Sequence, residues 1–215
     1  MIFTREQIKN VLAGHHVYNE NVIDLLERLK SHDDRTFLKS INTMKVVAKI
    51  IETYSSVQEE EKEEVLIGAV LHDIGYLSIK KETINPKKGI TAHEYNEIKL
   101  HPIYGLDVIS KYPELDKKQI KDIVLCHHEI TDGSGYPRGI TEISQYAQLV
   151  GAVSAFRAMS YESRKKHLPP YQALITLAYE GVSQKIINNI QFVYNEKKEN
   201  KVIPYVNKMS LCGTN

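Results

Sequence analysis

The sequence has few cysteines, no tryptophan, no excess of either charge and no long apolar run. Its two cysteines, Cys126 and Cys212, are too few for a disulfide framework and favour a reducing compartment. Lys and Arg number 28 against 27 Asp and Glu, so the chain lacks the basic excess typical of non-specific nucleic-acid binders. The longest apolar run, residues 65–71, is far shorter than the roughly 20 residues that span a membrane. We therefore expect neither DNA nor a membrane as a partner.

The first residues, MIFTREQIKN, also lack the apolar core of a secretory signal, and we expect a cytoplasmic protein. The 215 residues suit one ordinary domain, and a hydrophobic fraction of 42% is enough for a packed core. What the chain does contain is histidine, nine in all, including two adjacent pairs. The placement of these histidines is the main clue to function.

Apolar residues recur every three or four positions along most of the chain, and this spacing predicts helices. Thr4 and Gln7 form the pattern of a capping box, and Thr91 is expected to cap a later helix. Pro102 suits the first turn of another helix and should hold His101 in a non-helical conformation. No alternating pattern predicts a strand, so the expected fold class is all-α, a helical bundle. The other predicted helical regions are 4–30, 37–54, 59–73, 118–126, 144–159 and 170–180.

Two pairs of chemically active residues stand at predicted helix ends. His72 and Asp73 follow an apolar helix, and His127 and His128 follow the helix over 118–126. Neighbouring residues on a helix point about 100° apart, so such a pair reaches one ion only where the backbone turns, or else serves two ions. Imidazole and carboxylate are typical ligands of zinc, iron and manganese. The alternative is that these histidines only stabilise the carbonyl ends of helices.

Four segments of the sequence resemble the HD-GYP domain, a branch of the HD phosphohydrolase superfamily. They are LHDIG at 71–75, HP at 101–102, HHE at 127–129 and DGSGYP at 132–137. HHE followed at this spacing by DGSGYP is highly specific, whereas HD alone would be weak. The resemblance covers about two-thirds of the chain and implies an all-α HD-domain bundle. It also implies hydrolysis of cyclic di-GMP, or of a related cyclic dinucleotide, with two or three iron or manganese ions.

The same resemblance implies roles for individual residues. His72 and Asp73 would be the catalytic pair, with Asp73 bridging the ions while a hydroxide attacks the phosphodiester in line. The implied metal ligands are His72, Asp73, His101, His127 and His128. The implied substrate-binding residues are Gly135, Tyr136, Pro137, Arg164 and Lys166. A solvated charged turn would explain the last two cations equally well.

Three positions depart from the family pattern. The stretch KSINTMKVV, residues 39–47, holds no histidine, although the family takes a metal ligand from the helix before HD. Ser154 stands where the family has its last aspartate ligand, and Tyr76 replaces the lysine of HDIGK. A serine hydroxyl is a poor substitute for a carboxylate on a hard divalent ion. One ion thus loses two ligands while the set of the other is complete, so we expect one or two ions.

These observations leave three hypotheses open. The chain is an active metal-dependent phosphodiesterase, a catalytically degenerate domain that regulates by binding a nucleotide or a protein, or a structural module whose histidines bind nothing. Expected partners are a cyclic dinucleotide, a protein at the GYP loop and a second copy of the chain at the N-terminal helices. We expect an N-terminal helical extension over 1–35, an HD-GYP-like domain over 36–200 and a C-terminal tail over 201–215.

Overall fold

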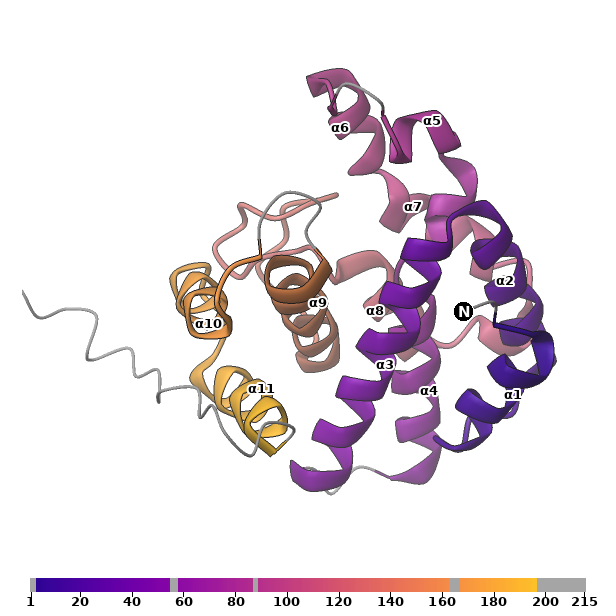
Figure 1. Ribbon diagram of the computed structural model, residues 1–215, viewed down its shortest axis with the longest axis horizontal. Helices are drawn as coiled ribbons and strands as arrows, with labels where there is room; N and C mark the ends of the chain where they lie inside the picture. The colour runs from indigo at the N-terminus through magenta and orange to yellow at the C-terminus, as the bar shows by residue number, and fades with distance from the viewer. Residues whose placement is uncertain (1–2, 55–57, 87–88, 163–166, 197–215) are drawn as a thin grey trace, which may run out of the picture.

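The computed structural model of the protein describes residues 3–54, 58–86, 89–162 and 167–196. Within these ranges every regular element is helical, which confirms the predicted all-α fold (Figure 1). The α-helices are α1 (Arg5–Ala13), α2 (Glu20–His32), α3 (Asp34–Tyr54), α4 (Glu59–Leu71), α5 (Lys81–Ile84), α6 (Ala92–Ile98), α7 (His101–Ile109), α8 (Lys118–Cys126), α9 (Gln145–Arg157), α10 (Pro170–Tyr179) and α11 (Gln184–Glu196). Shorter helical segments are η1 (Ile74–Ser78), η2 (Pro113–Leu115) and η3 (Ala158–Glu162).

Helix α3 is the spine of the bundle and packs against α2, α4, α9 and α11 (Figure 1). Its apolar residues recur at helical spacing and are almost fully buried, as Phe37, Ile41 and Met44 illustrate. In α4, by contrast, every residue from Val65 to Leu71 is buried, and both α3 and α8 pack against this helix. A helical segment that is apolar on every face lies in the interior of a protein. The residues that directly follow α4, His72 and Asp73, are therefore buried in the interior of the molecule.

The N-terminal helices α1 and α2 share the main apolar core, to which Ile8, Leu12 and Leu26 contribute. The predicted capping box of Thr4 with Gln7 is present, and Thr91 caps α6 in the same way with Glu94. The division of the chain at residue 36 stays a prediction. The expected tail over 201–215 lies outside the described residues.

Some helical details differ from the predictions. His101 is already the first residue of α7, so the expected non-helical His101 is wrong. The steric restriction before a proline is a bias, and close packing of this residue against Gly75 overrides it. Helix α11 was not predicted at all. None of the helices in the described ranges is both long enough and apolar enough to span a membrane.

Candidate metal centre

Three histidines stand at helix ends in one shared arrangement. His72 follows α4, His101 begins α7, and His127 follows α8. In each histidine, Nδ1 lies close to the backbone carbonyl oxygen three residues earlier. The distance is 2.8 Å in His72 and His101 and 3.0 Å in His127. A carbonyl can only accept, so Nδ1 is the protonated nitrogen and donates. The lone pair of every Nε2 is therefore free to face the centre, which is the usual orientation of a histidine that binds a metal ion.

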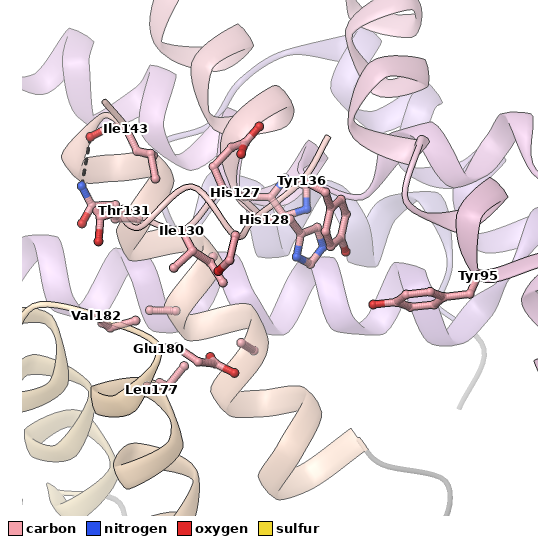
Figure 2. Close-up of a pocket in the computed structure, with 18 residues that line it drawn as sticks. Tyr95, His127, His128, Ile130, Thr131, Tyr136, Ile143, Leu177, Glu180 and Val182 are labelled. Carbon is pink, nitrogen blue, oxygen red and sulfur yellow. Dashed lines mark hydrogen bonds between the residues drawn. The ribbon is translucent and has the colours of Figure 1, made fainter. Parts of the chain in front are cut away.

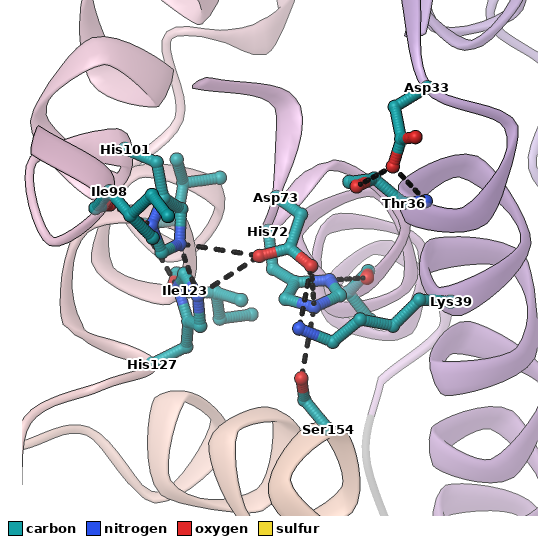
Figure 3. Close-up of polar contacts among 12 residues, drawn as sticks. Asp33, Thr36, Lys39, His72, Asp73, Ile98, His101, Ile123, His127 and Ser154 are labelled. Carbon is teal, nitrogen blue, oxygen red and sulfur yellow. Dashed lines mark hydrogen bonds and ion pairs between the residues drawn. The ribbon is translucent and has the colours of Figure 1, made fainter. Parts of the chain in front are cut away.

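These nitrogens meet the carboxylate of Asp73 (Figure 3). Asp73 Oδ1 lies 3.2 Å from His101 Nε2 and 3.6 Å from His127 Nε2. His128 completes a group with these three residues in which one ligand atom from each lies within 4.8 Å of all the others. The four residues come from three segments, so the tertiary fold assembles the group.

The other carboxylate oxygen, Asp73 Oδ2, faces a different set of groups. Lys39 Nζ of α3 lies 2.8 Å from it, and His72 Nε2 lies 3.2 Å from it. His72 Nε2 is also 3.2 Å from Ser154 Oγ of α9 (Figure 3). Sequence reasoning missed Lys39. The only signal was its position as first residue of the stretch KSINTMKVV, where the family resemblance called for a histidine.

The four-residue group fits a divalent cation. Asp73 and His101 are fully buried and His127 is 3% exposed. Despite this burial, neither carboxylate oxygen of Asp73 accepts a hydrogen bond of ordinary geometry. Lys39 compensates the carboxylate on the Oδ2 side only, so Oδ1, which faces His101 and His127, remains available to a cation. Imidazole nitrogens with one carboxylate are a typical ligand set for iron, manganese or zinc.

Burial and the neighbouring charges together favour the protonation states that metal binding requires. It lowers the pKa of His127 to about 3 and that of His128 well below the usual range, and the neighbouring imidazoles act in the same direction. Burial would raise the pKa of Asp73, but His72, Lys39 and the other surrounding groups outweigh it and hold this pKa well below its usual value. At neutral pH, His127 and His128 are thus uncharged while Asp73 is ionised.

Two glycines hold the ligand-bearing backbone in place. A Cβ atom on Gly75 would lie 1.9 Å from the carbonyl oxygen of His101, and one on Gly151 would lie 2.0 Å from that of His127. Such distances are impossible for any residue with a side chain. Segments η1 and α9 therefore touch the backbone of the ligand residues directly, and the glycine of the HDIG motif positions His101.

Two tyrosines cover the imidazoles. The ring of Tyr76 lies 4.6 Å from that of His101, and Tyr136 stacks on His128 at 4.5 Å with an interplanar angle of 20°. Burial raises the pKa of both phenols, and the negative charge of Asp73 adds to this effect. Where the family pattern has a lysine, Tyr76 thus places a neutral aromatic ring against His101.

A pocket of about 400 Å³ opens beside the candidate metal-binding group (Figure 2). His127 and His128 form one part of its wall, and Tyr136 lies beside them. Leu177, Glu180 and Val182 line it from the region of α10. The pocket therefore joins the buried polar centre to the surface, with both polar and apolar groups in its wall.

Glu129 fixes the loop that carries the GYP sequence. It is 7% exposed, and its carboxylate accepts hydrogen bonds from the backbone N–H groups of Arg138 at 2.8 Å and Ile140 at 3.1 Å. Glu129 directly follows His128, so the same short segment carries a candidate ligand and anchors the loop.

The predicted site residues are thus partly brought together. Asp73, His101, His127 and His128 form one group, whereas His72 faces the opposite oxygen of Asp73. Gly135 and Tyr136 line the pocket, but Pro137 is not part of its wall. The predicted substrate contacts Arg164 and Lys166 lie outside the described residues.

The chain is similar to two curated proteins over about two-thirds of its length. The chain is 31% identical over 156 residues to "Cyclic di-GMP phosphodiesterase response regulator RpfG" of Xanthomonas campestris, covering 70% of this chain and 41% of that protein. It is 27% identical over 146 residues to "Cyclic di-GMP phosphodiesterase PA4108" of Pseudomonas aeruginosa, covering 65% and 34%. The chain therefore spans less than half the length of these two relatives.

Two solved structures share the fold. The HDG"Y"P protein Bd1817 of Bdellovibrio bacteriovorus has a TM-score of 0.59 at 18% identity, over 73% of this chain and 51% of that one. The HD domain of the Listeria monocytogenes phosphodiesterase PgpH, solved with cyclic-di-AMP, has a TM-score of 0.61 at 14% identity, over 83% and 99%. These two similarities confirm the predicted HD-domain bundle. A family model described as "HD domain" matches residues 19–186, more than half of the sequence, so the chain belongs to the HD domain family.

Proposed function

We propose that this chain is a metal-dependent phosphodiesterase that hydrolyses cyclic di-GMP or a related cyclic dinucleotide. The observation that carries the proposal is the convergence of Asp73, His101, His127 and His128 within 4.8 Å, beside a pocket. Two curated relatives whose names describe cyclic di-GMP phosphodiesterases support the choice of substrate class.

The residues present would hold iron or manganese through three imidazole nitrogens and one carboxylate oxygen. When bound, a divalent ion supplies Lewis acidity, which activates water and stabilises the charge that develops on the phosphodiester. The carbonyl partners of the imidazole Nδ1 atoms fix the direction of each lone pair. Burial excludes competing solvent from Asp73 and keeps electrostatic attraction strong.

The pocket would take one nucleoside part of the substrate. Tyr136 lines the pocket beside His128 and would offer an aromatic group to the substrate. Tyr95, Gln148 and Glu180 add polar groups to the wall, which are suited to the edges of a base. The loop anchored by Glu129 would place Gly135 and Tyr136 against the substrate.

Incubation with cyclic di-GMP, cyclic di-AMP and 3′3′-cyclic GMP–AMP tests this proposal. The purified chain is loaded anaerobically with iron(II) or manganese(II), and the products are separated by chromatography. We expect linear dinucleotide or mononucleotide from at least one substrate. Asp73→Asn should lower the rate roughly 100-fold or more, because even changes behind a metal ligand cost about 10–100-fold.

His93→Ala is the matched control, since His93 is an exposed histidine on α6. It should retain the wild-type rate. If the metal-loaded chain leaves all three substrates intact over hours, the phosphodiesterase proposal is wrong.

A second candidate function is binding without hydrolysis. Lys39 and Ser154 stand beside His72 where a further metal ligand would be needed for a dinuclear centre, and this favours a regulator that retains only the pocket. Calorimetry with the same three nucleotides separates the two functions. A binding signal without product formation would select the regulator.

A further inference from the structure

The two oxygens of Asp73 differ in what they can offer to a metal ion. Oδ1 faces His101 and His127, and the group that can meet around one ion includes these two residues. His72 is not a member of that group. Oδ2 already contacts a positive charge, because Lys39 Nζ lies 2.8 Å from it.

The Oδ2 side has a weak ligand set for a second divalent ion. Apart from Lys39, the contacts described on this side are those of His72 Nε2, which lies 3.2 Å from Oδ2 and 3.2 Å from Ser154 Oγ. One imidazole, one hydroxyl and a shared carboxylate oxygen do not match the ligands that iron or manganese usually takes. A single ion on the Oδ1 side needs none of these groups.

Lys39 points into this space rather than toward solvent. Its side chain is 21% exposed, against 1% for Asp73, so most of the stem is buried and the ammonium lies at the inner end. Figure 3 shows this end between Asp73 and Ser154. A metal ion bound to Oδ2 would compete with the ammonium for the same oxygen. The two cations would also repel each other strongly at such a short separation.

We propose that the Lys39 ammonium takes the place of a second metal ion, so that this chain holds one divalent ion at Asp73, His101, His127 and His128. The inference rests on the proposed function for what the bound ion does, but the inference itself concerns only how many ions bind. An ammonium carries one charge and three hydrogen-bond donors, and it cannot polarise a ligand as a divalent ion does. Lys39 thus compensates Asp73 and offers a donor to a phosphate oxygen, while Lewis acidity comes from one ion alone.

Manganese binding to the full chain tests the number of bound ions directly, without an activity assay. Elemental analysis and calorimetry should give one manganese(II) per wild-type chain, with the electron paramagnetic resonance spectrum of an isolated ion. Lys39→Met removes the neighbouring positive charge and should tighten manganese binding roughly tenfold or more. Lys49→Met, at an exposed position on the same helix, should leave the affinity unchanged.

A second variant rebuilds the missing ion site. Lys39→His combined with Ser154→Asp supplies an imidazole and a carboxylate beside His72. It should raise the stoichiometry to two and produce the spectrum of an exchange-coupled pair. If circular dichroism shows that this double variant does not fold, the affinity change in Lys39→Met decides.

Two ions in the wild-type chain, no ion at all, or unchanged or weaker manganese binding in Lys39→Met would each overturn the inference. Its failure is distinguishable from failure of the proposed function. One bound ion without hydrolysis would support the inference and contradict the phosphodiesterase proposal. Two bound ions with hydrolysis would contradict the inference and support the phosphodiesterase proposal.

Discussion

At the scale of single residues, Glu129 ties the candidate ligand His128 to the loop that lines the pocket. Its buried carboxylate accepts two backbone N–H groups, those of Arg138 and Ile140. An amide in the same place could accept through its oxygen, but its NH₂ group would face a donor. Glu129→Gln should therefore lower the free energy of unfolding by about 1–3 kcal/mol, the cost of an unpaired buried polar group.

Urea denaturation measures this change, and Glu142→Gln is the control. Glu142 is exposed a short distance along the chain, and its substitution should stay within about 0.5 kcal/mol of wild type. Equal stabilities for the two variants would show that Glu129 does not anchor the loop.

The sequence predicted least well which individual side chains meet at Asp73. Histidines at helix ends could be recognised from the chain alone, because the apolar runs before them end there. Their convergence could not, since it depends on how α4, α7 and α8 pack. Lys39 was missed because a lysine in an amphipathic helix is typically a surface residue. Only the tertiary fold shows that this one points inward to Asp73.

At the scale of elements, the contact between η1 and α7 positions the candidate ligand His101. Gly75→Ala would place a Cβ 1.9 Å from the carbonyl oxygen of His101, so the two segments must separate. We expect a loss of about 1–3 kcal/mol in stability, as for other overpacked positions. Manganese affinity should fall roughly tenfold or more, because His101 moves with its backbone.

Urea denaturation and manganese calorimetry measure the two effects. Gly14→Ala is the comparison, since a Cβ there meets its nearest atom, the carbonyl oxygen of Asn10, at 3.3 Å and the backbone is right-handed. It should change manganese affinity little. If Gly75→Ala binds manganese as wild type does, the η1–α7 contact does not set the position of His101.

Most helices could be predicted, since local signals mark them. The helix over 118–126 matches α8, and the capping boxes begin α1 and α6 as expected. Helix α11 was missed although Ile186, Ile190 and Val193 recur at helical spacing and are buried. The π-helical turn η3 after α9 has no comparable local signal, so the predicted helix over 144–159 ran past Arg157, where α9 ends.

At the scale of the whole molecule, one ion would tie together segments far apart in the sequence. Asp73 follows α4, His101 begins α7, and His127 and His128 follow α8, so the unfolded chain has no preformed site. A ligand that binds only the folded state adds about 2.7 kcal/mol at one hundred times its dissociation constant. Manganese at that excess should raise Tm by roughly 5–10 °C.

Thermal unfolding with manganese(II), and again after a chelator is added, measures this shift. The chelator should reverse it, and His101→Ala should show little shift at the same manganese concentration. An equal rise in Tm for wild type and His101→Ala would mean that manganese stabilises the fold at some other place.

The Nδ1 hydrogen bonds at His72, His101 and His127 each use a backbone carbonyl three residues earlier. At the ends of α4 and α8 those carbonyls belong to the last helical turn, where acceptors lack partners. At the end of α8, the imidazole of His127 thus both terminates a helix and presents a candidate metal ligand. Replacing it with cysteine or aspartate would keep a ligand atom but remove the N–H that ends the helix. A change of metal preference at this position would therefore also be a change in folding, which restricts how far the site can diverge.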